Sequence, residues 1–198
     1  MDFNSLTFAA LLGGYVLGSI PFGLFIAKLG GQGDVRAIGS GNIGATNVLR
    51  TGRKDLAALT LLFDAGKAAL ALILARHFAG EAAGYLAGAA ALVGHCFPLW
   101  LKFKGGKGVA TYFGFLFAAA WPLGLIAGAV WLLSAFATRM SSLSALLAAI
   151  AAPIAAYVMG NRVLAIVAAA LTVLVFIRHR ENIGRILSGT ETKIGSKK

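Results

Sequence analysis

A short segment rich in glycine and small polar residues, GSGNIGATNVLR over residues 39–50, has the composition of an anion-binding loop. Closely spaced glycines, here Gly39, Gly41 and Gly44, can present successive backbone N–H groups to a negative group. The segment ends in Arg50, whose guanidinium can bind phosphate through two parallel hydrogen bonds. We therefore predict a phosphate-binding loop. Its neutral hydrogen-bonding side chains are those of Ser40, Asn42, Thr46 and Asn47.

The glycine spacing also matches the G-x-G-x-x-G pattern of dinucleotide-binding folds, and Asp64 follows at the distance expected of a ribose-binding acid. We reject that interpretation because no strand precedes the glycines and Asp64 lies inside an apolar stretch. A flexible, solvated connector is the alternative. The density of small polar residues around a single arginine argues against it.

A second basic segment, KFKGGKGVAT over residues 102–111, contains a lysine between glycines. It is not a Walker A loop, because Leu101 stands where the first glycine belongs and Gly108 replaces the required Ser or Thr. Lys107 nevertheless lies where a new apolar stretch begins, and the N-terminus of a helix favours a bound anion. We predict that Lys107 binds an anion. Its flanking glycines, also candidate substrate-binding residues, are Gly105, Gly106 and Gly108.

Other polar residues around these loops have simpler explanations. Basic residues on one side of a membrane set the orientation of a protein, and that role suffices for four lysines. These are Lys102, Lys104, Lys197 and Lys198. For His95, which precedes the second segment in the sequence GHCFP, two hypotheses stay open: a simple bond to a carbonyl, or a part in function.

The tail over residues 178–191 carries a third candidate group. His179 and Asn182 are three residues apart, so they share a face if the tail is helical. Apolar residues at helical spacing would let the same helix lie on the membrane surface. A cationic membrane anchor is the alternative, and it explains His179 and Asn182 less well.

The composition places the chain among membrane proteins. Of its 198 residues, 59% are hydrophobic and only 13% are charged, against about 25% in soluble domains. The net charge of +11 comes from basic residues between apolar stretches, which favours anionic lipid or a phosphate substrate over nucleic acid. Cys96 is the single cysteine, so the sequence excludes an internal disulfide and a cysteine metal cluster.

Apolar stretches predict the membrane spans. A spanning helix needs about 20 residues, and only Asp2 precedes the first stretch, which we interpret as a retained span. The run over residues 109–137 is long for one span and short for two, and Pro122 favours a break near its middle. The other spans are residues 3–27, 56–75, 82–100, 141–160 and 163–177.

The distribution of basic residues decides how many spans the run makes. Of the 18 basic residues, Lys67 lies within a span and is counted on neither side. If the run makes two spans, fifteen of the others fall on one side of the membrane and two on the other, whereas a single span would place nine on one side and eight on the other. The positive-inside rule therefore predicts seven spans, two of them short, with the N-terminus outside and the C-terminus cytoplasmic. The expected fold is an all-α compact bundle forming a single polytopic domain over residues 1–198, in the bacterial inner membrane.

Charged residues within the spans are few. Asp64 and Lys67 are three residues apart in one span, so we expect them to pair in the bundle interior. The pair would be structural or would support the site residues without touching the substrate, and a proton relay is the less favoured alternative. No H-x-x-x-x-D motif of soluble glycerolipid acyltransferases is present, and neither is a histidine–carboxylate set at metal spacing. We expect no metal and no cofactor.

Together these motifs resemble the bacterial acyl-phosphate:glycerol-3-phosphate acyltransferases, the PlsY family. The similarity covers nearly the whole chain, in GSGNIGATNVLR, GHCFP, KFKGGKGVAT and HRENIGRILSGTETK, and in FDAGKA around Asp64. It implies transfer of a fatty acyl group from a long-chain acyl phosphate to the sn-1 hydroxyl of glycerol 3-phosphate. It also implies membrane lipid as surroundings and no coenzyme A, acyl carrier protein, metal or obligatory protein partner.

The resemblance suggests roles for the candidate residues. Arg50 and Lys107 would hold phosphates, and His179 with Asn182 would complete the phosphate site. Ser40 and Asn42, or nearby backbone N–H groups, would donate to the developing oxyanion. The general base is open between His179 and the phosphate of the substrate, and the family favours the phosphate. Two other functions fit the sequence less well. A transporter of a phosphorylated solute usually shows polar residues at mid-depth in both halves, and the aspartate-rich motif of a CDP-alcohol phosphotransferase is absent.

Overall fold

The computed structural model describes residues 5–195, and every regular element in that part of the chain is a helix. This confirms the expected all-helical class. The chain divides into two compact units, Met1–Ala119 (unit 1) and Ala120–Lys198 (unit 2). The single domain expected over residues 1–198 stays a prediction, and Lys197 and Lys198 lie outside the described residues.

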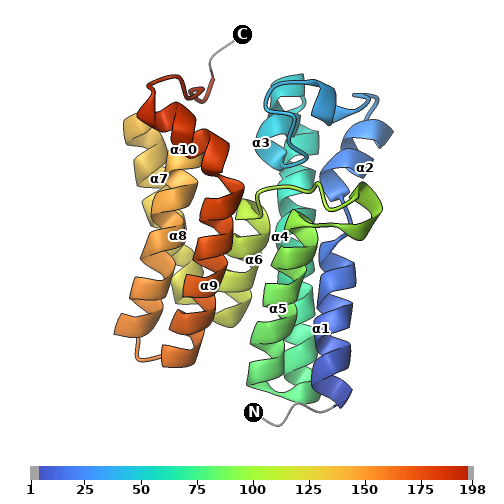
Figure 1. Cartoon of the computed structure of the whole chain (residues 1–198), viewed down its shortest axis with the longest axis vertical. Helices are drawn as coiled ribbons and strands as arrows, with labels where there is room; N and C mark the ends of the chain where they lie inside the picture. Colours follow the sequence, from blue (N-terminus) through green and yellow to red (C-terminus); the bar gives the residue numbers. More distant parts are fainter. Residues whose placement is uncertain (1–4, 196–198) are drawn as a thin grey trace. The chain divides into compact units, whose positions relative to one another are not determined.

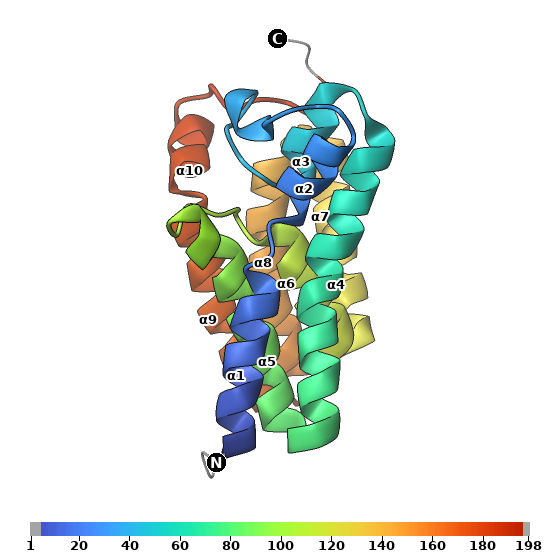
Figure 2. The same cartoon turned by 90° about the vertical axis from the view of Figure 1, so that its right-hand side faces the viewer.

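Unit 1 is built on α1 (Ser5–Gly18), α4 (Lys54–Ala79) and α5 (Glu81–Cys96), which lie side by side (Figures 1 and 2). α6 (Val109–Ala119) packs against α4. Small residues allow these close approaches, since van der Waals packing drives the association of helices in lipid. A Cβ atom at Gly114 of α6, for example, would overlap the carbonyl oxygen of Ala65 in α4.

The first span, predicted over residues 3–27, corresponds to the segment Ser5–Leu29, which is long and apolar enough to cross a membrane but is interrupted between two helices. α1 ends at Gly18, and α2 (Phe22–Leu29) begins after Pro21. Proline lacks the N–H that would continue the hydrogen bonds of α1 and leaves the preceding backbone irregular. The indole of Trp100 donates to the carbonyl oxygen of Ser19 in this break, at 2.8 Å, and holds it against the end of α5.

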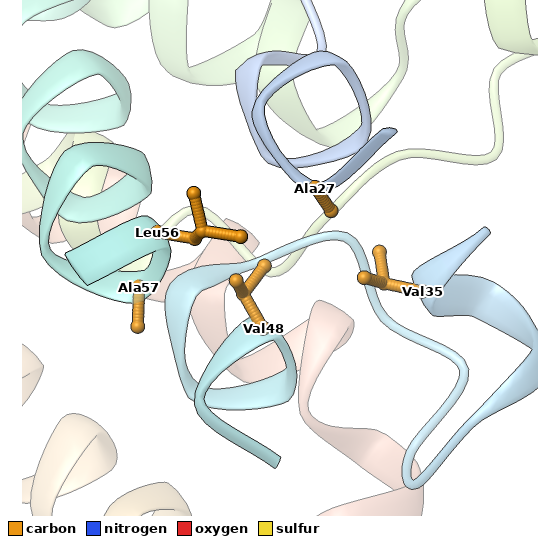
Figure 3. Packing of buried hydrophobic residues seen from close by; sticks show 5 residues of the cluster. All are labelled: Ala27, Val35, Val48, Leu56 and Ala57. Atoms are coloured by element: carbon orange, nitrogen blue, oxygen red, sulfur yellow. The ribbon is translucent and has the colours of Figure 1, made fainter. Parts of the chain in front are cut away.

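Short helical turns form the loop between α2 and α4. They are η1 (Val35–Ala37), α3 (Ala45–Val48) and η2 (Leu49–Thr51). A small apolar cluster beneath them attaches the loop to α2 and α4, with every member at most 7% exposed (Figure 3). The cluster consists of Ala27, Val35, Val48, Leu56 and Ala57. A further turn, η3 (Leu99–Leu101), follows α5.

Unit 2 contains α7 (Trp121–Thr138), α8 (Ser141–Val158), α9 (Arg162–Arg178) and the short α10 (Arg180–Leu187). α8 packs against both α7 and α9, and α10 bends away from α9 by 65°. The tail expected to be helical is therefore helical, and the bend falls at His179.

The break expected in the apolar run of residues 109–137 is present. α6 ends at Ala119, and Pro122 lies in the first turn of α7, where a missing N–H costs nothing. Arg76 of α4 donates to the carbonyl oxygens of Ala118 (3.0 Å) and Ala119 (3.3 Å). The side chain thereby satisfies carbonyl groups that the end of a helix leaves without intrahelical partners.

Five helical segments among residues 5–195 are long and apolar enough to cross a membrane, and the bent pair α9 and α10 would make six. α6 has 11 residues, fewer than a perpendicular span needs. The count of seven stays a prediction, in which α6 is a short span. The five segments are Ser5–Leu29, Lys54–Ala79, Glu81–Leu101, Trp121–Thr138 and Ser141–Val158.

The loops predicted to be cytoplasmic lie toward one end within each unit (Figures 1 and 2). In unit 1, segments 30–53 and 97–108 lie away from the turn at Gly80. In unit 2, the N–H of Ile194 donates to the carbonyl oxygen of Arg139, so the tail returns to the turn between α7 and α8. The inside–outside orientation of the chain stays a prediction.

Two neighbouring glycines of α1 test the close packing of unit 1. A Cβ at Gly14 would overlap the backbone of Ala87 in α5, whereas a Cβ at Gly13 meets nothing within 4 Å. We expect Gly14→Ala to destabilise the protein by about 1–3 kcal/mol through overpacking. The measurement is thermal unfolding in detergent micelles, with Gly13→Ala as the matched control. Equal unfolding temperatures for the two variants would contradict the packing.

Candidate active site

The amide of Asn47 organises the glycine-rich loop from within. Its side chain is 2% exposed, and Nδ2 donates to the carbonyl oxygens of Val35 (2.7 Å) and Asn42 (2.8 Å). A third acceptor, the carbonyl oxygen of Ile38, lies 3.2 Å from the same Nδ2 atom and is bonded more weakly, because the amide has only two N–H groups. Because a buried carbonyl left unpaired is costly, Asn47 fixes the path of the backbone on both sides of the glycines.

The oxygen of the same amide faces the surface of the loop. Asn47 Oδ1 accepts from the backbone N–H of Ser40 (3.1 Å) and from Nη1 of Arg50 (3.2 Å). Gly39 must be glycine here, because its φ is +55° and a Cβ would lie 2.5 Å from that oxygen. The exposed Arg50 guanidinium is therefore held beside the backbone of Gly39 and Ser40.

The other predicted residues of this loop lie at or near its surface. Gly41 has a φ of +68°, and Gly44 precedes α3 with an ordinary φ of −81°. Asn42 Oδ1 accepts from the N–H of Ile43 at 3.0 Å, and Thr46 is exposed. Asn47 differs from these residues because its side chain is buried beneath the loop.

The second predicted segment folds back on the end of α5. The N–H of Gly105 donates to the carbonyl oxygen of Cys96 (3.2 Å), and the N–H of Gly106 donates to that of His95 (3.1 Å). A Cβ on Gly105 would overlap the His95 carbonyl oxygen, and one on Gly106 would overlap Nε2 of the His95 ring. Both glycines are required by this close approach rather than by flexibility.

Lys107 follows these glycines and is partly buried. Gly108, with a φ of +80°, directly precedes α6. Lys102 and Lys104 are exposed, as expected of residues that only set orientation.

The ion pair predicted within the second span is present. Lys67 Nζ lies 3.0 Å from Asp64 Oδ1, and both side chains are at most 2% exposed. Sequence analysis did not include His95 in this pair, yet its Nδ1 lies 2.8 Å from Lys67 Nζ. The residues are 28 positions apart, and only the packing of α4 against α5 brings them together.

In unit 2, His179 occupies the bend between α9 and α10 and is 2% exposed. Its Nδ1 lies 2.8 Å from the carbonyl oxygen of Val175. A carbonyl can only accept, so we assign the proton to Nδ1, which makes Nε2 the acceptor in the neutral ring.

Asn182 is tied to an acid that the sequence did not single out. Its Nδ2 donates to Glu191 Oε1 at 2.7 Å, and Glu191 also accepts from Ser142 Oγ and Arg185 Nε, both at 2.8 Å. Burial raises the pKa of Glu191, but the hydrogen bonds from Ser142, Asn182 and Arg185 outweigh it, so this pKa lies below its usual range. Glu191 is one of two acids, with Glu181, in this strongly basic tail, and that was the available signal.

The structure therefore brings the predicted residues together in part. Gly39, Ser40, Asn47 and Arg50 form one cluster in unit 1, and His179 and Asn182 lie at one bend of unit 2. The convergence of the three segments on one site stays a prediction. Among residues 5–195, no group of three or more His, Cys, Asp or Glu side chains is placed to hold a metal ion.

Comparison with known proteins identifies the family. A sequence profile described as glycerol-3-phosphate acyltransferase matches residues 8–189. The chain belongs to the glycerol-3-phosphate acyltransferase family. It is 63% identical over 187 residues to the enzyme of that name from Dinoroseobacter shibae, covering 94% of this chain and 92% of the relative. The enzyme from Brucella suis is 59% identical over 195 residues, which cover 98% and 96% of the two chains.

Solved structures of the family show the same fold. A crystal structure of PlsY (YgiH), an integral membrane glycerol 3-phosphate acyltransferase, in its glycerol 3-phosphate form matches with a TM-score of 0.90 and 38% identity, covering 96% of each chain. The lysophosphatidic acid form matches with a TM-score of 0.89 and 37% identity, covering 96% of this chain and 95% of that one. The resemblance inferred from the motifs is confirmed, and the chain is an integral membrane glycerol-3-phosphate acyltransferase.

The buried amide of Asn47 can be tested without an activity assay. Asn47→Asp keeps the oxygen that Ser40 and Arg50 bond but replaces Nδ2 with an oxygen facing three carbonyls. Leaving such carbonyls unpaired costs about 1–3 kcal/mol, so we expect amide hydrogen exchange over residues 35–50 to accelerate about 10-fold or more.

The control for that experiment is the exposed neighbour Thr46. Exchange over residues 35–50 in Thr46→Ala should match the parent protein. If Asn47→Asp exchanges no faster than Thr46→Ala, Asn47 does not organise the loop.

Proposed function

We propose that this enzyme transfers a fatty acyl group from acyl phosphate to the sn-1 hydroxyl of glycerol 3-phosphate, giving lysophosphatidic acid and inorganic phosphate. The observation that carries the proposal is the Asn47-centred loop, which holds the Arg50 guanidinium beside the left-handed Gly39 and the backbone N–H of Ser40. Such a cationic, N–H-rich surface suits phosphate. Both substrates carry a phosphate, and phosphate is also the leaving group.

The chemical step is an acyl transfer. The sn-1 oxygen attacks the acyl carbonyl carbon, the bond from that carbon to the phosphate oxygen breaks, and the hydroxyl proton passes to a base. Negative charge gathers on the carbonyl oxygen during attack, and Ser40 and Asn42, or nearby backbone N–H groups, donate to it. Loss of one such donor typically raises the barrier by about 2.7–4 kcal/mol.

Binding of the two phosphates requires fixed positive charge. Arg50 and Lys107 hold one phosphate each, and the glycine-rich segments on either side let the backbone approach the anions. His179 and Asn182 complete the phosphate site from the tail, where Glu191 orients the Asn182 amide. Coenzyme A, acyl carrier protein and metal take no part in this scheme.

The base is proposed to be the phosphate of the substrate. A phosphate monoester has a second pKa near 6, which suits proton transfer at neutral pH. His179 then acts as a positioning group, with its ring oriented by the Nδ1 bond to Val175.

The enzyme is proposed to lie in the bacterial inner membrane with seven spans, its N-terminus outside and its active site on the cytoplasmic face. The gathering of basic loops toward one end within each unit supports this orientation, since basic loops favour the cytoplasm. Membrane lipid surrounds the helices, and no obligatory protein partner is proposed.

Purified protein in detergent, given glycerol 3-phosphate and palmitoyl phosphate without metal, should release inorganic phosphate and form lysophosphatidic acid. Arg50→Ala and Lys107→Ala should each lower kcat/KM by about 100-fold, because each removes charge-assisted hydrogen bonds worth about 3 kcal/mol. The exposed Lys104→Ala serves as the control and should retain full activity. Absence of phosphate release from the parent protein would overturn the proposed donor, and full activity of either variant would remove its phosphate role.

The variant His179→Asn tests whether His179 is the general base or only a positioning group. The variant keeps a donor toward Val175 but lacks Nε2. We expect kcat at saturating substrate to fall less than about tenfold while KM rises, whereas loss of a general base costs about 10²–10⁴ in rate. Steady-state kinetics with both substrates varied makes the distinction. Near-complete loss of kcat in a folded variant would assign the base to His179 instead.

A further inference from the structure

Lys67 makes a complete set of hydrogen bonds inside unit 1. An ammonium group has three N–H donors. Lys67 Nζ finds three acceptors, at 3.1 Å in the carbonyl oxygen of Ile20, at 3.0 Å in Asp64 Oδ1 and at 2.8 Å in His95 Nδ1. The side chains of Lys67, Asp64 and His95 are all at most 4% exposed.

This arrangement determines the tautomer of His95. His95 Nδ1 also lies 3.5 Å from Asp64 Oδ1, but its contact with Lys67 is much shorter. Because Lys67 can only donate, Nδ1 accepts, and the proton of the neutral ring lies on Nε2. The Asp64 carboxylate balances the charge of Lys67, so the three side chains form one satisfied polar network.

The ring of His95 then faces the segment that carries Lys107. Its Nε2 and Cε1 atoms lie where a Cβ on Gly106 would be, so the backbone of Gly106 rests directly on the imidazole. The carbonyl oxygen of His95 accepts from the Gly106 N–H at 3.1 Å. His95 thus holds Gly106 by both its ring and its backbone, one residue before Lys107.

We propose that the Asp64–Lys67–His95 network is a positioning device for the anion-binding segment, which fixes Gly106 and thereby the approach of Lys107 to a substrate phosphate. The proposal rests on the proposed role of Lys107. Stability of the fold alone does not explain this network, because buried ion pairs seldom stabilise a fold more than apolar residues of similar volume do. Here the hydrogen bond from Lys67 fixes the orientation of the His95 ring on which Gly106 rests.

The test is a double-mutant cycle on His95 and Gly106, read by binding. His95→Asn keeps an acceptor for Lys67 but lacks Nε2 and Cε1, so the backbone of Gly106 loses its support. Gly106→Ala pushes the same backbone off the intact ring. Each should weaken binding of glycerol 3-phosphate or of inorganic phosphate about tenfold by titration calorimetry, as expected for loss of one well-placed contact.

The double variant should bind the anion with about the same affinity as whichever single variant binds it less tightly. The reason is that Asn at position 95 lacks the ring atoms that an alanine at position 106 would meet. Residues that act through one contact give such non-additive effects. Strictly additive losses, or unchanged binding of both anions by a folded His95→Asn, would overturn the proposal. Steady-state kinetics should show the same change in KM, with kcat altered less than about threefold.

Two matched controls lie in the same unit. His77→Asn changes an exposed histidine at the far end of α4, and Gly13→Ala adds a methyl group in open space. Both should bind anions like the parent protein. Calorimetry needs no acyl donor, so the two proposals can fail separately. If the parent protein binds glycerol 3-phosphate but does not use palmitoyl phosphate, the proposed donor is wrong, and the binding experiment still tests the network.

Discussion

The absence of water inside a membrane is the constraint on which the structure of this acyltransferase depends. There, a backbone polar group withdrawn from the surface needs a partner within the chain, and a buried charged side chain gains strongly from one. Lys67 shows the rule in its strictest form, with three donors matched to three acceptors that come from the break after α1, from α4 and from α5. The same contacts join the break at Pro21 to the helices beside it, so satisfying one charge also fixes the packing of unit 1.

Outside the helices, the same principle shapes the loops. Asn47 replaces regular secondary structure, because its amide satisfies carbonyl and N–H groups that the irregular backbone of residues 35–42 leaves open. Glu191 has the corresponding role in unit 2, where its carboxylate accepts hydrogen bonds from the side chains of Ser142, Asn182 and Arg185. The exposed side chain of Arg50, which we propose to bind phosphate, is thereby presented on a backbone fixed by Asn47, and such preorganisation favours binding.

The glycines of this family member serve two physical purposes. Some, such as Gly39 and Gly108, adopt a left-handed backbone that other residues avoid. Others, such as Gly14 and Gly106, let a helix or a ring approach the backbone more closely than any side chain would allow. The sequence alone shows that glycine is abundant, but the kind of glycine depends on neighbours that are far away along the chain.

The sequence by itself determined the membrane class, the helical fold, the break near Pro122, the Asp64–Lys67 pair and the family, because hydropathy, short spacing and motifs are local properties. It missed the break at Pro21 and the partners His95 and Glu191. It also could not distinguish the buried Asn47 from its exposed neighbours Ser40 and Thr46. These features depend on which helix ends and loops meet in space. Only the tertiary structure decides that, since hydrogen bonds between residues such as Lys67 and His95 join positions with no regular spacing.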